Sequence, residues 1–196
     1  MPRRKTDIEP AEDETALVLR ARRGDSVAFG EIVRRYQRAV YRVAYGYTRN
    51  TADADDLAQE TFVNAYRAIS RFRISEPMFP WLARIATNLA FSLHRRRKRR
   101  PESSIEPLLE AGKQWGVDDD PARHAENRER ESHLAEAFGE LSSEHQAVLL
   151  LRVMEGLTYD EIARALGVPA GTVMSRLARA RTDLRARLAK RTGESK

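Results

Sequence analysis

The sequence predicts an all-α fold of two small helical domains, joined by a flexible acidic linker, with a helix-turn-helix in the C-terminal domain. Three observations predict it. Apolar residues recur with the 3.6-residue period of a helix on both sides of the linker, and no strand pattern of consequence appears. The interval 101–131 loses this period and holds three prolines and nine acids against four cations. Finally, Leu157 to Arg181 has the pattern of two short helices around a glycine turn.

These patterns divide the chain into five segments. We expect a disordered head over 1–14, a first domain over 15–100 and the linker over 101–131. A second domain over 132–191 and a short tail over 192–196 complete the chain. A length of 196 residues is enough for one or two small domains, and 41% apolar residues can supply their cores.

The first domain has the pattern of three helices. Asp25 or Ser26 can cap the first, which carries an apolar stripe from Phe29 to Val43, and Asn50 to Asp53 offers a cap for the second. The third helix is expected from about Pro80 to Arg97, after a loop over Phe72 to Phe79 that Pro77 and Pro80 favour.

The second domain has the pattern of four helices. Leu134 to Phe138 and Ser142 to Arg152 form the first two, with Ser142 or Ser143 as a cap. Thr158 and Glu161 then have the spacing of a capping box, and Gly167 ends the third helix. The fourth helix places five apolar residues on one face, namely Val173, Leu177, Ala180, Leu184 and Leu188.

Positive charge gathers at two places and indicates a polyanionic partner. The formal net charge is +6. Arg95 to Arg100 is a run of six cations, and Thr158 to Arg191 holds eight cations against three acids. Such local basic surfaces are typical of nucleic-acid binding, although a basic face can also simply be solvated.

Composition excludes several classes of function. The chain has no cysteine, so it has no disulfide, thiolate metal site or direct thiol redox sensor. No apolar run has the length of a membrane span, and the N-terminal stretch lacks the apolar core of a signal peptide. We therefore expect a cytoplasmic protein without membrane contact of its own.

Catalytic and cofactor motifs are also missing. The four histidines lack metal-ligand spacing, and no phosphate-binding glycine loop is present, so we expect no metal, no cofactor and no enzymatic activity. The best catalytic candidate is a carboxylate cluster at a helix start, where the positive end of the helix dipole stabilises acidic side chains. A surface for a basic protein partner explains the rest of this cluster, which consists of Asp53, Asp55, Asp56 and Glu60.

Two segments carry residue types suited to DNA. The outer face of the last helix would enter the major groove, and it presents Thr172, Met174, Ser175, Arg176 and Arg179. The loop Phe72 to Phe79 combines apolar and aromatic side chains with Arg73 and Arg84, which suits the capture of an unstacked base. The alternatives are a solvated amphipathic hairpin for the first segment and membership of the small core for Phe72 and Trp81.

Four stretches together resemble one known family. They are DDLAQETFVNAYRAISRF, PWLARIATN, RRRKRRP and LTYDEIARALGVPAGTVMSRLARAR, in that order along the chain. They resemble the extracytoplasmic-function (ECF, group IV) sigma factors of the sigma-70 family. The resemblance implies a non-catalytic transcription initiation factor that binds the largest and second-largest subunits of core RNA polymerase. It also implies that the first domain (region 2) melts the minus-ten element and the second (region 4) reads the minus-thirty-five element of promoter DNA, and that an anti-sigma factor is a further partner.

The resemblance assigns site residues one by one. It implies that the clamp helices of the largest polymerase subunit contact Asp56, Leu57, Gln59, Glu60 and Phe62, and that the minus-thirty-five element contacts the five outer residues of the last helix. Asn88 corresponds to an asparagine near the flipped minus-ten base. The full set expected at the minus-ten element is Phe72, Arg73, Met78, Phe79, Arg84, Asn88, Arg95 and Arg96. Ile74, Met78 and Met174 depart from the residues that the family often has there.

Two other classes share the C-terminal half of this pattern. A helix-turn-helix regulator that acts without core polymerase would need a sensing pocket or a dimer seam in its N-terminal half. A small DNA recombinase would need an N-terminal α/β catalytic domain, and the sequence shows no strands there. Co-elution with core polymerase distinguishes both classes from a sigma factor.

Overall fold

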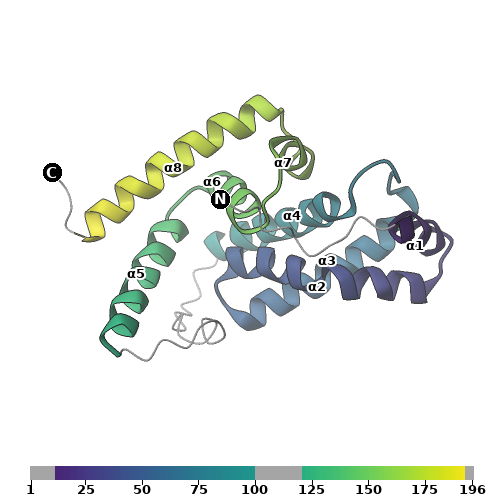
Figure 1. The fold of residues 1–196 in the computed structure, drawn as a ribbon, viewed down its shortest axis with the longest axis horizontal. Helices are drawn as coiled ribbons and strands as arrows, with labels where there is room; N and C mark the ends of the chain where they lie inside the picture. The colour runs from purple at the N-terminus through teal and green to yellow at the C-terminus, as the bar shows by residue number, and fades with distance from the viewer. Residues whose placement is uncertain (1–11, 100–120, 193–196) are drawn as a thin grey trace.

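The computed structural model describes residues 12–99 and 121–192 (Figure 1). All the secondary structure in these two ranges is helical, as the sequence predicts. Three of the expected segments lie partly outside the described residues: 1–11 of the head 1–14, 101–120 of the linker 101–131, and 193–196 of the tail 192–196. The first helix begins at Glu12, three residues inside the expected head. Within the described ranges, no helix has both the length and the apolar composition needed to cross a membrane.

The first domain contains α1 (Glu12–Arg22), α2 (Ser26–Thr48), α3 (Thr51–Ala68), the short 3-10 turn η1 (Ile69–Arg71) and α4 (Met78–Arg99). Two caps have the predicted positions. The side chain of Asp25 accepts hydrogen bonds from the backbone amides of Val27 and Ala28, and that of Asn50 accepts one from Asp53. Helix α2 packs against α1, α3 and α4, so it is the centre of this domain.

Helix α4 begins at Met78, two residues before the predicted start at Pro80. A proline in the first turn of a helix removes an amide that has no intrahelical partner, so Pro80 does not break this helix. The apolar side of α4 supplies much of the core, with Met78 and Leu82 at most 1% exposed.

The second domain contains α5 (Pro121–Gly139), α6 (Ser143–Leu149), the wide π-helical turn η2 (Leu150–Met154), α7 (Tyr159–Leu166) and α8 (Ala170–Thr192). Ser142 caps α6 by accepting from the amide of His145. Helix α5 starts inside the interval 101–131 that the sequence assigns to the linker. Pro121 suits a first helical position, and the alanines, glutamates and arginines after it have high helix propensity even though their apolar spacing is weak.

The helix-turn-helix has the local chemistry that the sequence predicts. Thr158 and Glu161 form the capping box, in which the Glu161 carboxylate accepts from the Thr158 amide at 2.7 Å. Gly167 ends α7 with φ of 66°, a left-handed conformation that glycine adopts without a steric penalty. Three of the predicted inward residues of α8, Val173, Leu177 and Ala180, are buried.

The two domains pack against each other in this structure. Helix α7 packs against α4 (Figure 1). The η2 turn contacts α2. Buried apolar residues of both domains form one continuous cluster. The sequence predicts only a linker connection, so this docking is additional to the expected arrangement.

Candidate functional site

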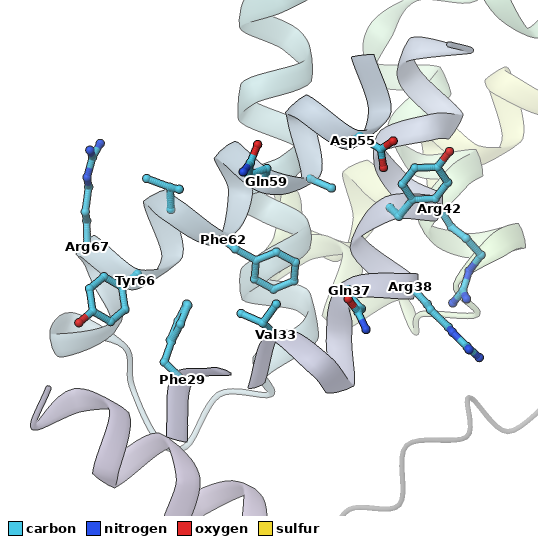
Figure 2. A pocket seen from close by; sticks show the side chains of 13 residues that line it. Phe29, Val33, Gln37, Arg38, Arg42, Asp55, Gln59, Phe62, Tyr66 and Arg67 are labelled. Carbon is cyan, nitrogen blue, oxygen red and sulfur yellow. The ribbon is translucent and has the colours of Figure 1, made fainter. Parts of the chain in front are cut away.

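A groove with a volume of about 1380 Å³ runs between α2 and α3 (Figure 2). Phe29, Val33 and Phe62 form an apolar floor, and the ring of Tyr66 meets that of Phe29 edge to face at 5.0 Å. Polar and charged side chains surround this floor, including Gln37, Arg38, Arg42, Asp55, Gln59 and Arg67. An apolar floor with a mixed polar rim is the general form of a protein-binding surface.

The structure brings only part of the predicted polymerase set into this groove. Gln59 and Phe62 line it, whereas Asp56 and Glu60 are exposed on α3 one helical turn apart and outside it. Leu57 is 4% exposed and belongs to the core. The set therefore divides into two groove residues, two exposed acids and one core residue.

Sequence reasoning missed the wall of the groove that α2 supplies. Arg38 and Arg42 lie one turn apart on this helix, and Gln37 and Tyr41 lie beside them. The sequence signal that could have indicated this wall was the pair of arginines, one turn apart, on a helix that also has an apolar face. Arg42 also bonds Glu155 of the second domain, and this contact raises the pKa of the Arg42 guanidinium.

An exposed polar edge of α4 carries several of the predicted minus-ten residues. Arg84 and Asn88 lie one turn apart and are exposed, and Arg95 and Arg96 are exposed nearer the end of the helix. The guanidinium of Arg95 donates to Ser92 Oγ at 3.0 Å. The structure thus aligns cations and an amide along one helix, as contact with a nucleic-acid backbone requires.

Three apolar residues of the 72–79 loop belong to the core instead of lining an open pocket, whereas Ile74 is exposed. Phe72, Met78 and Phe79 are 4%, 1% and 8% exposed. The Phe72 ring packs against Trp81 at 4.9 Å, and the Phe79 ring stacks on Tyr36. In this conformation the exposed part of the predicted loop is its middle, where Arg73 forms an ion pair with Glu76 at 3.8 Å.

The five residues predicted at the minus-thirty-five element lie on the outer side of α8 and differ in exposure. Met174, Ser175 and Arg179 are exposed, while Thr172 and Arg176 are half-buried. Ser175 Oγ donates to the carbonyl of Thr172 at 3.0 Å. An apolar side chain, two hydroxyls and two guanidiniums in the N-terminal half of this helix can pair with the chemical groups that the major groove presents.

The carboxylates at the start of α3 do not form a metal site. Over the described ranges, no group of three or more histidines or acids is arranged to hold a metal ion. Asp53 lies in the first turn of α3, as expected of an acid that favours the helix dipole.

A groove with an apolar floor in one helical domain and a basic helix-turn-helix in the other indicate a DNA-binding transcription factor with a further partner. Sequence families assign each half. Residues 32–100 match sigma-70 region 2, and residues 133–184 match sigma-70 region 4.

Curated relatives give a more specific assignment. The chain is 35% identical to the ECF RNA polymerase sigma factor SigE of Mycolicibacterium smegmatis over 96% of this chain and 73% of the relative. It is 34% identical to the RNA polymerase sigma-H factor of Pseudomonas aeruginosa over 87% of this chain and 91% of the relative. The chain belongs to the ECF sigma factors of the sigma-70 family. It is therefore a promoter-specificity factor that binds core RNA polymerase, and a regulator acting without the polymerase is not favoured.

Solved structures agree with the fold. The structure of CnrH in complex with the cytosolic domain of CnrY matches with a TM-score of 0.67 and 27% identity, over 91% of this chain and 99% of CnrH. The sigma factor RpoE in complex with the anti-sigma factor NepR from Bartonella quintana matches with a TM-score of 0.65 and 24% identity, over 82% and 96%.

Proposed function

We propose that the groove between α2 and α3, together with the exposed acids of α3, binds the largest subunit of core RNA polymerase. The observation that carries this proposal is the apolar floor at Phe29 and Phe62 inside a charged rim. Gln59 and Phe62 would contact the partner in the groove, and Asp56 and Glu60 would attract its basic groups beside it. Leu57 supports the helix from within the core.

The exposure of most of the polar residues concerned supports the proposed contacts with DNA. The polar edge of α4 contacts the minus-ten element, with Asn88 against an unpaired base and Arg84, Arg95 and Arg96 against phosphates. Arg73 approaches the same strand, while Phe72, Met78 and Phe79 hold the loop from beneath. The outer face of α8 contacts the minus-thirty-five element through Thr172, Met174, Ser175, Arg176 and Arg179. Residues 15–100 act as region 2, and residues 132–191 act as region 4.

The chain acts as a non-catalytic specificity subunit in the cytoplasm. One sigma factor with this fold, RpoE of Bartonella quintana, has been solved in complex with the anti-sigma factor NepR. An anti-sigma factor is accordingly a partner of this chain as well.

Charge reversal on α3 tests the polymerase site. Glu60→Lys is expected to weaken assembly with core polymerase, because an exposed acid that attracts a basic partner then repels it. Glu131→Lys, a reversal at an exposed position of α5, is the matched control. Assembly is measured by co-elution, and helix content by circular dichroism. If both variants assemble with core polymerase equally well, Glu60 does not belong to the polymerase site.

A further inference from the structure

Arginines gather at the end of the first domain where α4 begins, apart from the polar edge of that helix. Two segments that are distant in the sequence supply them, the end of α1 and the turn that follows α3 (Figure 1). Helix α1 packs on η1, and Arg22 Nε donates to the carbonyl of Ser70 at 3.3 Å. We call Arg22, Arg23, Arg71 and Arg73 the arginine cluster, and all four are exposed.

The positive charge around the cluster is largely uncompensated. Residues 20–25 and 67–76 together hold six arginines and two acids. One acid, Asp25, is already engaged, since it pairs with Arg20 at 2.7 Å and caps α2. The other, Glu76, lies 3.8 Å from an exposed guanidinium of the cluster, and such exposed pairs are weak. A local excess of positive charge therefore remains for a partner.

Most hydrogen-bond donors of the cluster are also free. In the part of the chain that the structure describes, Arg23 and Arg71 form no hydrogen bond or ion pair. Arg22 donates only through Nε, so its two terminal nitrogens have no acceptor there. A planar guanidinium binds a phosphate through two parallel hydrogen bonds. Exposed arginines with open donors therefore suit a chain of phosphates.

The 72–79 loop separates the cluster from the polar edge of α4. Asn88 lies about 15 Å along the helix axis from Met78, the first residue of α4, at a rise of about 1.5 Å per residue. A stacked strand covers this distance in about four to five nucleotides at about 3.4 Å each, and a stretched strand needs fewer. In the loop between them, Ile74 is 37% exposed and offers an apolar contact to an unstacked base. A strand held at Asn88 therefore reaches the cluster within a few nucleotides.

The order of the elements along the chain gives the direction of this strand. Helix α4 ends at Arg99, and the chain continues from there to the domain proposed to read the upstream minus-thirty-five element. The end of α4 that carries Arg95 and Arg96 therefore belongs to the upstream side. The loop end, with the arginine cluster, belongs to the downstream side.

We propose that the arginine cluster binds phosphates of the opened DNA strand just downstream of the captured base. The inference rests on the proposed minus-ten contact of Asn88, and it adds Arg22, Arg23 and Arg71 to the DNA surface. Because these contacts are with the backbone, they hold the strand whatever its sequence. Arginines that meet the strand only after it has separated from its complement favour the open promoter over the closed one.

Forked promoter probes test this contact with the chain assembled as holoenzyme. A short probe has a duplex minus-thirty-five element and ends with a single-stranded minus-ten element. A long probe carries about six further single-stranded nucleotides downstream. Core polymerase can contribute to both, so each variant is compared with the parent on the same pair of probes. We expect the parent to bind the long probe more tightly and with a steeper dependence on salt.

Two variants each remove one charge from the cluster at an exposed position, Arg23→Gln and Arg71→Gln. Each should lower the slope of log affinity against log salt concentration by about 0.7 on the long probe, as for one phosphate contact with a single strand. Binding to the short probe should not change. Arg34→Gln is the matched control, because it removes an exposed charge of the same domain outside the cluster, the groove and the edge of α4. It should match the parent on both probes.

Equal binding of the long probe by the parent and both cluster variants would overturn the proposal. An equal loss on both probes would also overturn it, as would a loss of assembly with core polymerase, which would assign the cluster to the polymerase. The proposed minus-ten site has its own readout, since Arg84→Gln should weaken binding to both probes. If the parent binds the short probe no better than a probe without the minus-ten strand, that site is wrong instead.

Discussion

Two arginines on the outer side of α8 differ in their exposure. Arg179 is exposed, whereas Arg176 is half-buried beside the apolar face of the helix. An extended guanidinium can reach a base edge, while one held close to its own helix has a shorter reach and suits a phosphate. The two side chains therefore have different tasks in the proposed minus-thirty-five contact.

Alanine variants separate these tasks. Arg179→Ala is expected to lose about 1–3 kcal/mol of discrimination at one base pair. Arg176→Ala is expected to weaken binding to all promoter variants similarly. It should also lower the slope of log affinity against log salt concentration by about one. Titration of both variants, as holoenzyme, against promoter variants over a range of salt checks this. Identical behaviour of the two would refute the division.

At the scale of elements, the turn into the helix-turn-helix is tightly specified. Arg152 donates to the carbonyl of Leu157 at 2.8 Å and lies over the ring of Tyr159 at 5.2 Å. The capping box at Thr158 follows at once. These contacts fix the direction in which α7 starts and, through Gly167, the angle at which α8 follows.

Removal of the cap tests this element. Thr158→Ala should destabilise the C-terminal domain by about 0.5–2 kcal/mol, because the amide of Glu161 loses its acceptor. Thr182→Ala is a control on the exposed side of α8, where the hydroxyl bonds only the carbonyl of Ala178 within its own helix. Thermal unfolding followed by circular dichroism compares them, and an equal midpoint shift would contradict the role of the cap.

The sequence predicts elements well where their signals are local. The caps at Asp25, Asn50 and Ser142 each depend on a side chain and an amide at most three residues away. The start of α5 was missed because its residues favour a helix without marking an apolar face. The burial of Met78 and Phe79 was missed for another reason. The sequence around an apolar residue near a loop is the same whether that residue lines a pocket or fills a core.

At the scale of the whole molecule, docking of the domains depends on contacts between residues more than a hundred positions apart. Arg42 and Glu155 are one such pair, and Gly46 and Leu150 are another. Neither pair can be recognised from the neighbouring sequence. A glycine inside a helix, or a single acid after one, occurs for many other structural reasons. The fold class was predictable from periodicity, whereas the relation between the domains required the structure.

In the proposed function the second domain docks at the minus-thirty-five element, while the first opens the minus-ten element and Asn88 holds the unpaired base. Its amide lies on the outer edge of α4, so Asn88→Ala removes hydrogen-bonding groups without leaving a cavity. Flipping a base costs a few kcal/mol, and loss of a group that holds the flipped base therefore impairs opening more than docking at the minus-thirty-five element. We expect Asn88→Ala holoenzyme to bind duplex promoters nearly as well as the parent but to yield less run-off transcript.

A template with a premelted minus-ten bubble distinguishes opening from folding. It should restore much of the transcription by Asn88→Ala, because the cost of unpairing is then already met. Met78→Ala, which empties a fully buried site, is expected to lose about 2–5 kcal/mol of stability instead, and the bubble should not restore its activity. If Asn88→Ala transcribes the closed duplex as well as the parent does, the edge of α4 does not hold the base, and the exposed residues around Arg73 become the next candidates.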